Sequence, residues 1–146
     1  MKKFKFLILL FLVISINSSF AQMTIPTSDG TMVREIAPKD FKNYKGSVLV
    51  MPAFKARGTK KWLTKQFQKN YGKPFFVADV SDVSTGYGDD KYPIETYKYM
   101  IFIQSSKSFS GNTEYSFQLV DRSTNTVYYH PSSGNMVKKY LKKLMK

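Results

Sequence analysis

Residues 97–104 read Tyr-Lys-Tyr-Met-Ile-Phe-Ile-Gln, and this stretch decides the fold. A β-strand points successive side chains to opposite faces, so the alternation puts apolar side chains on both faces of a strand here. Those on one face are Tyr97, Tyr99, Ile101 and Ile103, and those on the other are Met100 and Phe102. A strand that is apolar on both faces is typical of the covered interior of a sheet. We therefore predict that the rest of the domain packs around it.

Two more strands and a helix are predicted before this central strand. Residues 47–51 form an apolar run that Pro52 ends, which favours a short buried strand. A helix follows, with Thr59 as its expected N-cap and Gly72 where a left-handed C-terminus would fall. Residues 75–80 are expected to form the next strand. The buried face of the helix should consist of Leu63, Phe67 and Tyr71.

The chain after the central strand predicts a hairpin and a second helix. Residues 114–120 alternate cleanly, which indicates a strand with its other face in water, and residues 126–130 return antiparallel after a polar turn. Residues 81–96 carry glycine, proline and polar residues without any period, so we expect a long loop before the central strand. The final helix should bury a single apolar stripe, made of Val137, Tyr140, Leu141, Leu144 and Met145.

These elements predict one α+β domain over residues 47–146. Its mixed or antiparallel sheet should have about five strands, in the order strand, helix, four strands, helix, with both main helices on one face. Residues 22–46 are expected to be loosely structured, with a short edge strand at 31–33 and a single helical turn after Pro38.

Residues 1–21 have the pattern of a cleaved signal peptide. Three lysines precede an apolar run from Phe6 to Ile16, and Ser19 and Ala21 occupy the small positions of a cleavage site. The apolar run is too short for a membrane-spanning helix, which takes roughly 20 residues. We predict an exported, soluble protein of the periplasm or the cell exterior. The chain has no cysteine, so it cannot be a cysteine-linked lipoprotein.

The charge of the chain predicts an anionic partner. Lys and Arg number 23 against 10 Asp and Glu, and removing the leader takes away only three lysines and no acid. Such a surplus attracts anionic glycans, lipid head groups, nucleic acid or acidic protein surfaces, and it also keeps a secreted protein soluble. The sign of the charge does not choose among these partners.

Two basic clusters are candidate binding surfaces. The first lies where the strand at 47–51 passes into the first helix, whose amide groups and partial positive charge favour an anion. Its residues are Lys55, Arg57, Lys60 and Lys61. The second is the exposed face of the last helix, a possible polyanion surface made of Lys138, Lys139, Lys142 and Lys143. Lysines that simply extend into water are the competing interpretation for both clusters.

The sequence favours binding over catalysis. The one histidine, His130, ends a predicted strand, and the nucleophile and zinc motifs of common hydrolases are absent. We expect no cofactor and no metal ion, because the acidic loop lacks the alternating spacing of a calcium loop. The alternative is a small hydrolase that uses carboxylates of residues 81–96, which requires two carboxylates with raised pKa values in a concave site. Exposed tyrosines such as Tyr87, Tyr92 and Tyr128 would help to bind a glycan or a base.

Overall fold

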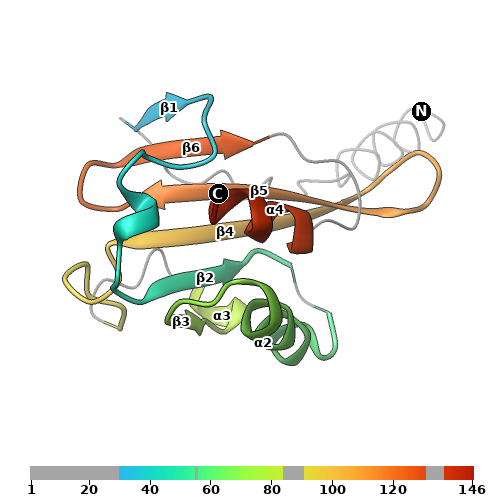
Figure 1. The fold of residues 1–146 in the computed structure, drawn as a ribbon. Helices are drawn as coiled ribbons and strands as arrows, with labels where there is room; N and C mark the ends of the chain where they lie inside the picture. Colours follow the sequence, from blue (N-terminus) through green and yellow to red (C-terminus); the bar gives the residue numbers. More distant parts are fainter. Residues whose placement is uncertain (1–29, 55, 84–90, 131–136) are drawn as a thin grey trace, which may run out of the picture.

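The computed structural model describes residues 30–54, 56–83, 91–130 and 137–146, and it has an α+β fold (Figure 1). One mixed sheet of six strands has the order β1-β6-β5-β4-β2-β3. Only β5 runs against the others, because β4 is parallel to β2 and antiparallel to β5. The strands are β1 (Thr31–Val33), β2 (Val48–Pro52), β3 (Phe75–Val77), β4 (Tyr99–Lys107), β5 (Thr113–Asp121) and β6 (Thr126–His130).

Both main helices cover the same face of this sheet, as predicted. In Figure 1, α4 (Val137–Leu144) lies over β4 and β5, and α2 (Thr59–Asn70) lies over β2 and β3. Their apolar stripes join the larger core, which also contains Tyr99, Ile101 and Ile103 of β4. The opposite face has a smaller core around Met100 and Phe102, close to the short helix α3 (Val80–Val83). The prediction that β4 is covered on both faces is confirmed.

The sixth strand comes from the segment that we expected to be loosely structured. β1 pairs in parallel with β6 and forms one edge of the sheet, so the expected edge strand at 31–33 is confirmed. The helical turn η1 (Phe41–Asn43) follows, and Phe41 is fully buried in the larger core. The ammonium group of Lys73 donates hydrogen bonds to three carbonyl oxygens around this turn, those of Phe41, Lys42 and Tyr44. Lys73 therefore fixes the amino-terminal segment to the end of α2.

The predicted strand at 75–80 was too long, and Pro52 explains the difference. Val48 donates to the carbonyl of Pro74, and Ala78 donates to that of Val50, so alternate residues of β2 face β3. The next residue of β2 on this side is Pro52, which has no N–H to continue the ladder. β3 therefore ends at Val77, and the chain turns into α3.

Three side chains differ from their predicted roles. Gly58, at φ 81°, is the N-cap of α2, and Thr59 is its first residue, whose hydroxyl bonds back to the backbone of Ala56. Tyr97 precedes β4 and packs against the smaller core, not with Tyr99. Val120 is buried in that same core, so the outer face of β5 is covered there and does not face water.

Tyr140 gives a test of the core between α4 and the sheet. Its ring stacks on Phe117 with 4.6 Å between centroids, but its buried hydroxyl has no hydrogen-bond partner among the described residues. Tyr140→Phe keeps the stack and removes the unpaired hydroxyl, so the free energy of unfolding should stay the same or rise by up to about 1 kcal/mol. Urea denaturation measures it, with Tyr140→Leu as the control that loses the stack. A fall of more than about 1 kcal/mol in Tyr140→Phe would show that the hydroxyl is bonded.

Candidate functional site

The two main helices form one basic layer. α2 and α4 each carry four lysines and no acidic residue, and all eight side chains are exposed. On α2, Lys61, Lys65 and Lys69 follow each other at four-residue intervals and form a row along the helix. On α4, Lys138 and Lys142 form one such row and Lys139 and Lys143 another. Both helices lie on one face of the sheet (Figure 1), so their eight lysines extend from that side of the molecule.

An open groove of about 1000 Å³ borders this layer at the carboxyl ends of β2 and β3. Pro52 closes β2 on one side of it, and Ala78 and Asp79 follow β3 on the other. The first turns of α2 form its wall, since β2 leads directly into that helix. The crevice at the carboxyl ends of parallel strands is the usual ligand position in open α/β sheets, because connections leave in opposite directions there. Here the chain leaves β2 toward α2 on one face of the sheet, and it leaves β3 toward α3 near the smaller core on the other face.

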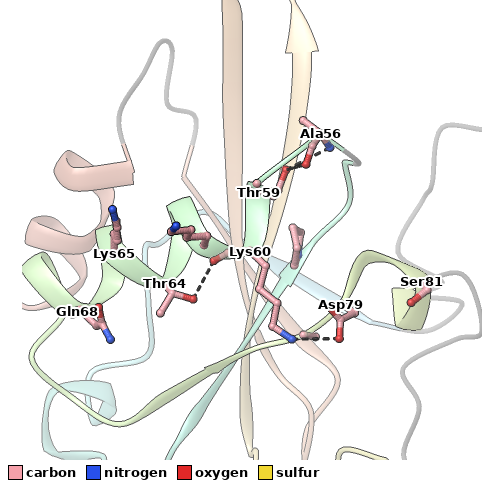
Figure 2. A pocket seen from close by; sticks show the side chains of 12 residues that line it. Ala56, Thr59, Lys60, Thr64, Lys65, Gln68, Asp79 and Ser81 are labelled. Atoms are coloured by element: carbon pink, nitrogen blue, oxygen red, sulfur yellow. Dashed lines mark hydrogen bonds and ion pairs between the residues drawn. The ribbon is translucent and has the colours of Figure 1, made fainter.

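The polar groups of this groove come from α2 and from the segment after β3 (Figure 2). The ammonium group of Lys60 lies 3.0 Å from a carboxylate oxygen of Asp79 and 5.6 Å from the ring centroid of Phe76. Both partners of the ion pair are about half exposed, so water screens it and it contributes little to stability. Thr64 donates its hydroxyl to the carbonyl of Lys60. Because its ion pair with Asp79 is exposed and weak, the Lys60 ammonium remains available to a competing anion.

The structure brings together only part of the predicted first cluster. Lys60 and Lys61 line the groove, Arg57 is exposed and does not line it, and Lys55 lies outside the described residues. Lys65 is a third lysine in the lining, and the sequence prediction missed it. The four-residue spacing from Lys61 was the available signal, because it places both side chains on one side of the helix. The four predicted lysines of the last helix are all exposed on α4.

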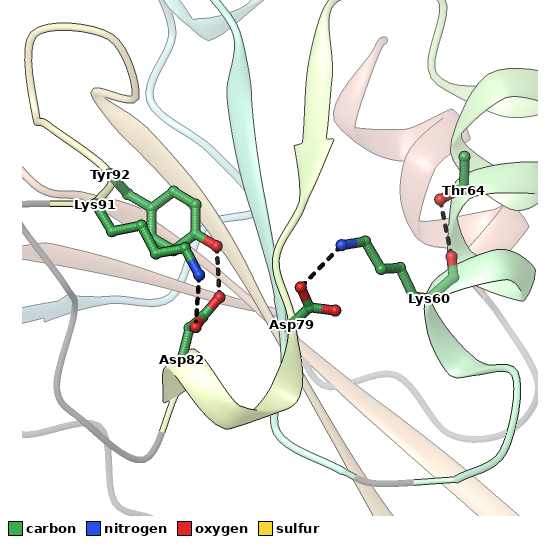
Figure 3. A network of polar contacts seen from close by, with 6 residues as sticks. All are labelled: Lys60, Thr64, Asp79, Asp82, Lys91 and Tyr92. Carbon is green, nitrogen blue, oxygen red and sulfur yellow. Dashed lines mark hydrogen bonds and ion pairs between the residues drawn. The ribbon is translucent and has the colours of Figure 1, made fainter.

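A second polar network lies beside the groove, between α3 and the chain that leads to β4 (Figure 3). The carboxylate of Asp82 accepts hydrogen bonds from the Lys91 ammonium at 2.8 Å and from the Tyr92 hydroxyl at 2.6 Å. These two bonds lower the pKa of Asp82 below its usual 3.8. Burial and the bond to Asp82 raise the pKa of Tyr92. Asp82 is therefore held in its ionised form.

This network bears on the chemistry expected of residues 81–96. A general acid needs a raised pKa, whereas that of Asp82 is lowered. Asp89 and Asp90 lie outside the described residues, as does Tyr87. Tyr92 is buried, so the expectation of an exposed stacking ring is wrong for it, and Tyr128 is partly buried against the larger core. Within the described ranges, no three His, Cys, Asp or Glu side chains form a group that could hold a metal ion.

Comparison with known proteins gives no family. No family model matches the chain, and neither a curated protein nor a solved structure matches it. For the part of the chain that the structure describes, no helix has the length and apolar character to cross a membrane.

We predict that the hydrogen bonds of the Asp82 carboxylate stabilise the fold at neutral pH and are lost in acid. Because its pKa is lower in the folded protein, the ionised carboxylate stabilises the fold above about pH 4, and this contribution is lost as the pH falls through the folded pKa. We expect Asp82→Asn to lower the free energy of unfolding by about 1 kcal/mol at pH 7, a typical loss for partly exposed bonds to a charged group. The difference from the unmodified protein should shrink at pH 3.

Thermal denaturation at both pH values measures this, with Glu95→Gln as the control for loss of one exposed carboxylate in the same segment. Equal melting temperatures for the Asp82 variant and the unmodified protein at pH 7 would show that these hydrogen bonds do not stabilise the fold.

Proposed function

We propose that this chain is an exported, non-catalytic binding protein that holds an anionic partner on the basic layer of α2 and α4. One observation carries the proposal: two adjacent helices place all their charge, eight lysines without a carboxylate, on one side of the molecule. An anionic glycan, lipid head group, nucleic acid or acidic protein fits this side by charge.

The arrangement of the lysines supports binding over simple solubility. Like charges four residues apart on a helix destabilise it by about 0.2–0.5 kcal/mol per pair. Lys61, Lys65 and Lys69 form two such pairs, and α4 carries two more. The first turn of α2 adds Lys60 and Lys61 near the partial positive charge of the helix terminus. Solubility requires only that positive charge lies somewhere on the surface. A bound anionic partner would offset the repulsion between these neighbouring lysines, which explains why they are placed together.

A triple variant tests the proposal. Lys61→Gln, Lys65→Gln and Lys69→Gln remove the row on α2 and keep good helix formers at each position. At roughly 1 kcal/mol per lysine near an anionic surface, the three changes should weaken binding to immobilised heparin about 100-fold. Heparin serves here as a general polyanion, and elution in a salt gradient followed by titration at fixed salt measures the effect.

The matched control removes the same charge from exposed positions outside the two helices, by Lys39→Gln, Lys45→Gln and Lys107→Gln. It should change heparin affinity far less than the triple variant on α2. Equal effects of the two triple variants would mean that net charge alone controls retention, and would overturn the proposed binding layer.

Export has its own test. A bacterial host that makes the full chain should release a product that starts at Gln22, because Ser19 and Ala21 supply the cleavage site. Intact mass and amino-terminal sequencing of the periplasmic and culture fractions identify the product. Leu10→Arg breaks the apolar run and should leave the full-length chain in the cytosol. Full-length protein in the cytosol without this change would contradict export.

A further inference from the structure

β3 leaves a set of backbone groups facing outward at one edge of the sheet. Pro74 and Ala78 bond to β2 through their carbonyl and amide groups, respectively. Successive residues of a strand direct their backbone groups to opposite sides, so the amides and carbonyls of Phe75 and Val77 point away from β2. β3 has no neighbour on that side in the strand order of the described sheet. These outward groups are able to pair with one more strand.

A groove of about 450 Å³ follows this edge. Its floor includes all three residues of β3, and its wall is formed by Lys60, Thr64 and Gln68 of α2. The same three α2 residues also line the larger groove at the carboxyl ends of the strands, so the two spaces are continuous along the helix. An extended chain placed here would lie beside β3 with α2 on one side.

The two sides of this edge differ in chemistry. On the α2 side, Lys60 is accompanied by Lys61 and Lys65 farther along the groove, and the carboxylate in the lining is that of Asp79. On the opposite side, the ring of Phe76 is 41% exposed and contacts the rings of Tyr92 and Tyr97, with centroids 5.8 and 6.1 Å away. The Lys60 side chain reaches from α2 to this edge, where its ammonium group lies 5.6 Å from the Phe76 ring centroid. A strand added at this edge would alternate its side chains between a basic wall and an aromatic surface.

We propose that the β3 edge binds an extended segment of an acidic partner protein as an additional strand. Its acidic side chains lie toward α2, and its apolar side chains lie on Phe76. Backbone hydrogen bonds to Phe75 and Val77 supply affinity, and the alternating side chains supply selectivity. This inference rests on the proposed function for the sign of the partner's charge.

Charge complementarity selects this occupant. The Lys60–Asp79 pair is exposed and weak, so a carboxylate of the incoming strand replaces Asp79 as the partner of Lys60 at little cost. A second copy of this chain is a poor occupant, because the basic layer next to the edge would face its own positive charge. Lysine and proline beside an edge strand disfavour unselective pairing in many proteins, and Lys60 and Pro74 lie beside β3.

A designed peptide tests the proposal. The probe is a fluorescein-labelled peptide of ten alternating Glu and Val residues with blocked ends, and fluorescence anisotropy measures its binding to the mature protein. Phe76→Asp should weaken binding about tenfold or more, because it removes the apolar ring, repels the acidic peptide and gives the nearby Lys60 ammonium a competing carboxylate. Phe109→Asp is the control, since Phe109 is another exposed phenylalanine but lies between β4 and β5, away from the β3 edge. Equal effects of the two variants would overturn the site.

N-methylation of the peptide tests strand pairing directly. One peptide is methylated on its Glu nitrogens and a second on its Val nitrogens, so each loses the donors on only one edge. Pairing with β3 predicts that one of the two binds and the other does not, and that the amides of Phe75 and Val77 gain protection from hydrogen exchange. Equal binding of both methylated peptides, or unchanged exchange at these amides, would overturn the proposal.

The heparin experiment keeps the two proposals apart. If the lysine row on α2 controls heparin retention but methylation of the peptide has no effect, the basic layer stands and strand addition is overturned. If one methylated peptide fails to bind while heparin retention is insensitive to the lysine row, strand addition stands and the basic layer is overturned.

Discussion

β2 pairs in parallel with β3 on one side and with β4 on the other, and all five of its residues are buried. This double pairing positions the groove and the free sheet edge beside α2. Because β3 runs parallel to β2, the chain must cross the sheet between them, and α2 is that crossover. The first turn of α2 therefore meets the carboxyl ends of both strands, where the groove with Lys60 and Asp79 forms. β3, placed outermost by the same pairing, presents its free edge beside the helix.

Local patterns in the sequence were sufficient for most of the fold. The two-residue period of the central strand and the four-residue period of Leu63, Phe67 and Tyr71 depend only on which side chains each element buries. The helix period was confirmed, and the strand period was confirmed from residue 99 onward but not for Tyr97. The length of β3 could not be predicted in this way. The point where β3 ends depends on Pro52, a residue of another strand, and that dependence exists only after the strands have paired.

The same limit separates the predicted and unpredicted parts of the site. Lysines on a helix can be identified from the sequence, so Lys60 and Lys61 were predicted to belong to the site. Lys65 could also have been predicted from its four-residue spacing from Lys61. Asp79 and Phe76 belong to the site only because β3 lies next to α2, and no spacing rule connects them to Lys60. Tyr92 was expected to be exposed because its neighbours are polar, yet it is buried and its hydroxyl bonds to Asp82. Polar neighbours do not exclude a buried aromatic ring whose hydroxyl has a partner.

The pairing of β1 with β6 joins residues near the two ends of the described chain, with Thr31 opposite Thr126. Contacts between such distant positions form late, since the intervening chain must be ordered before they can close. The amino-terminal edge of the sheet is therefore incomplete until β6, near the end of the chain, has been synthesised. A shorter chain that ends before Thr126 would have no β6, and so β1 would have no strand to pair with.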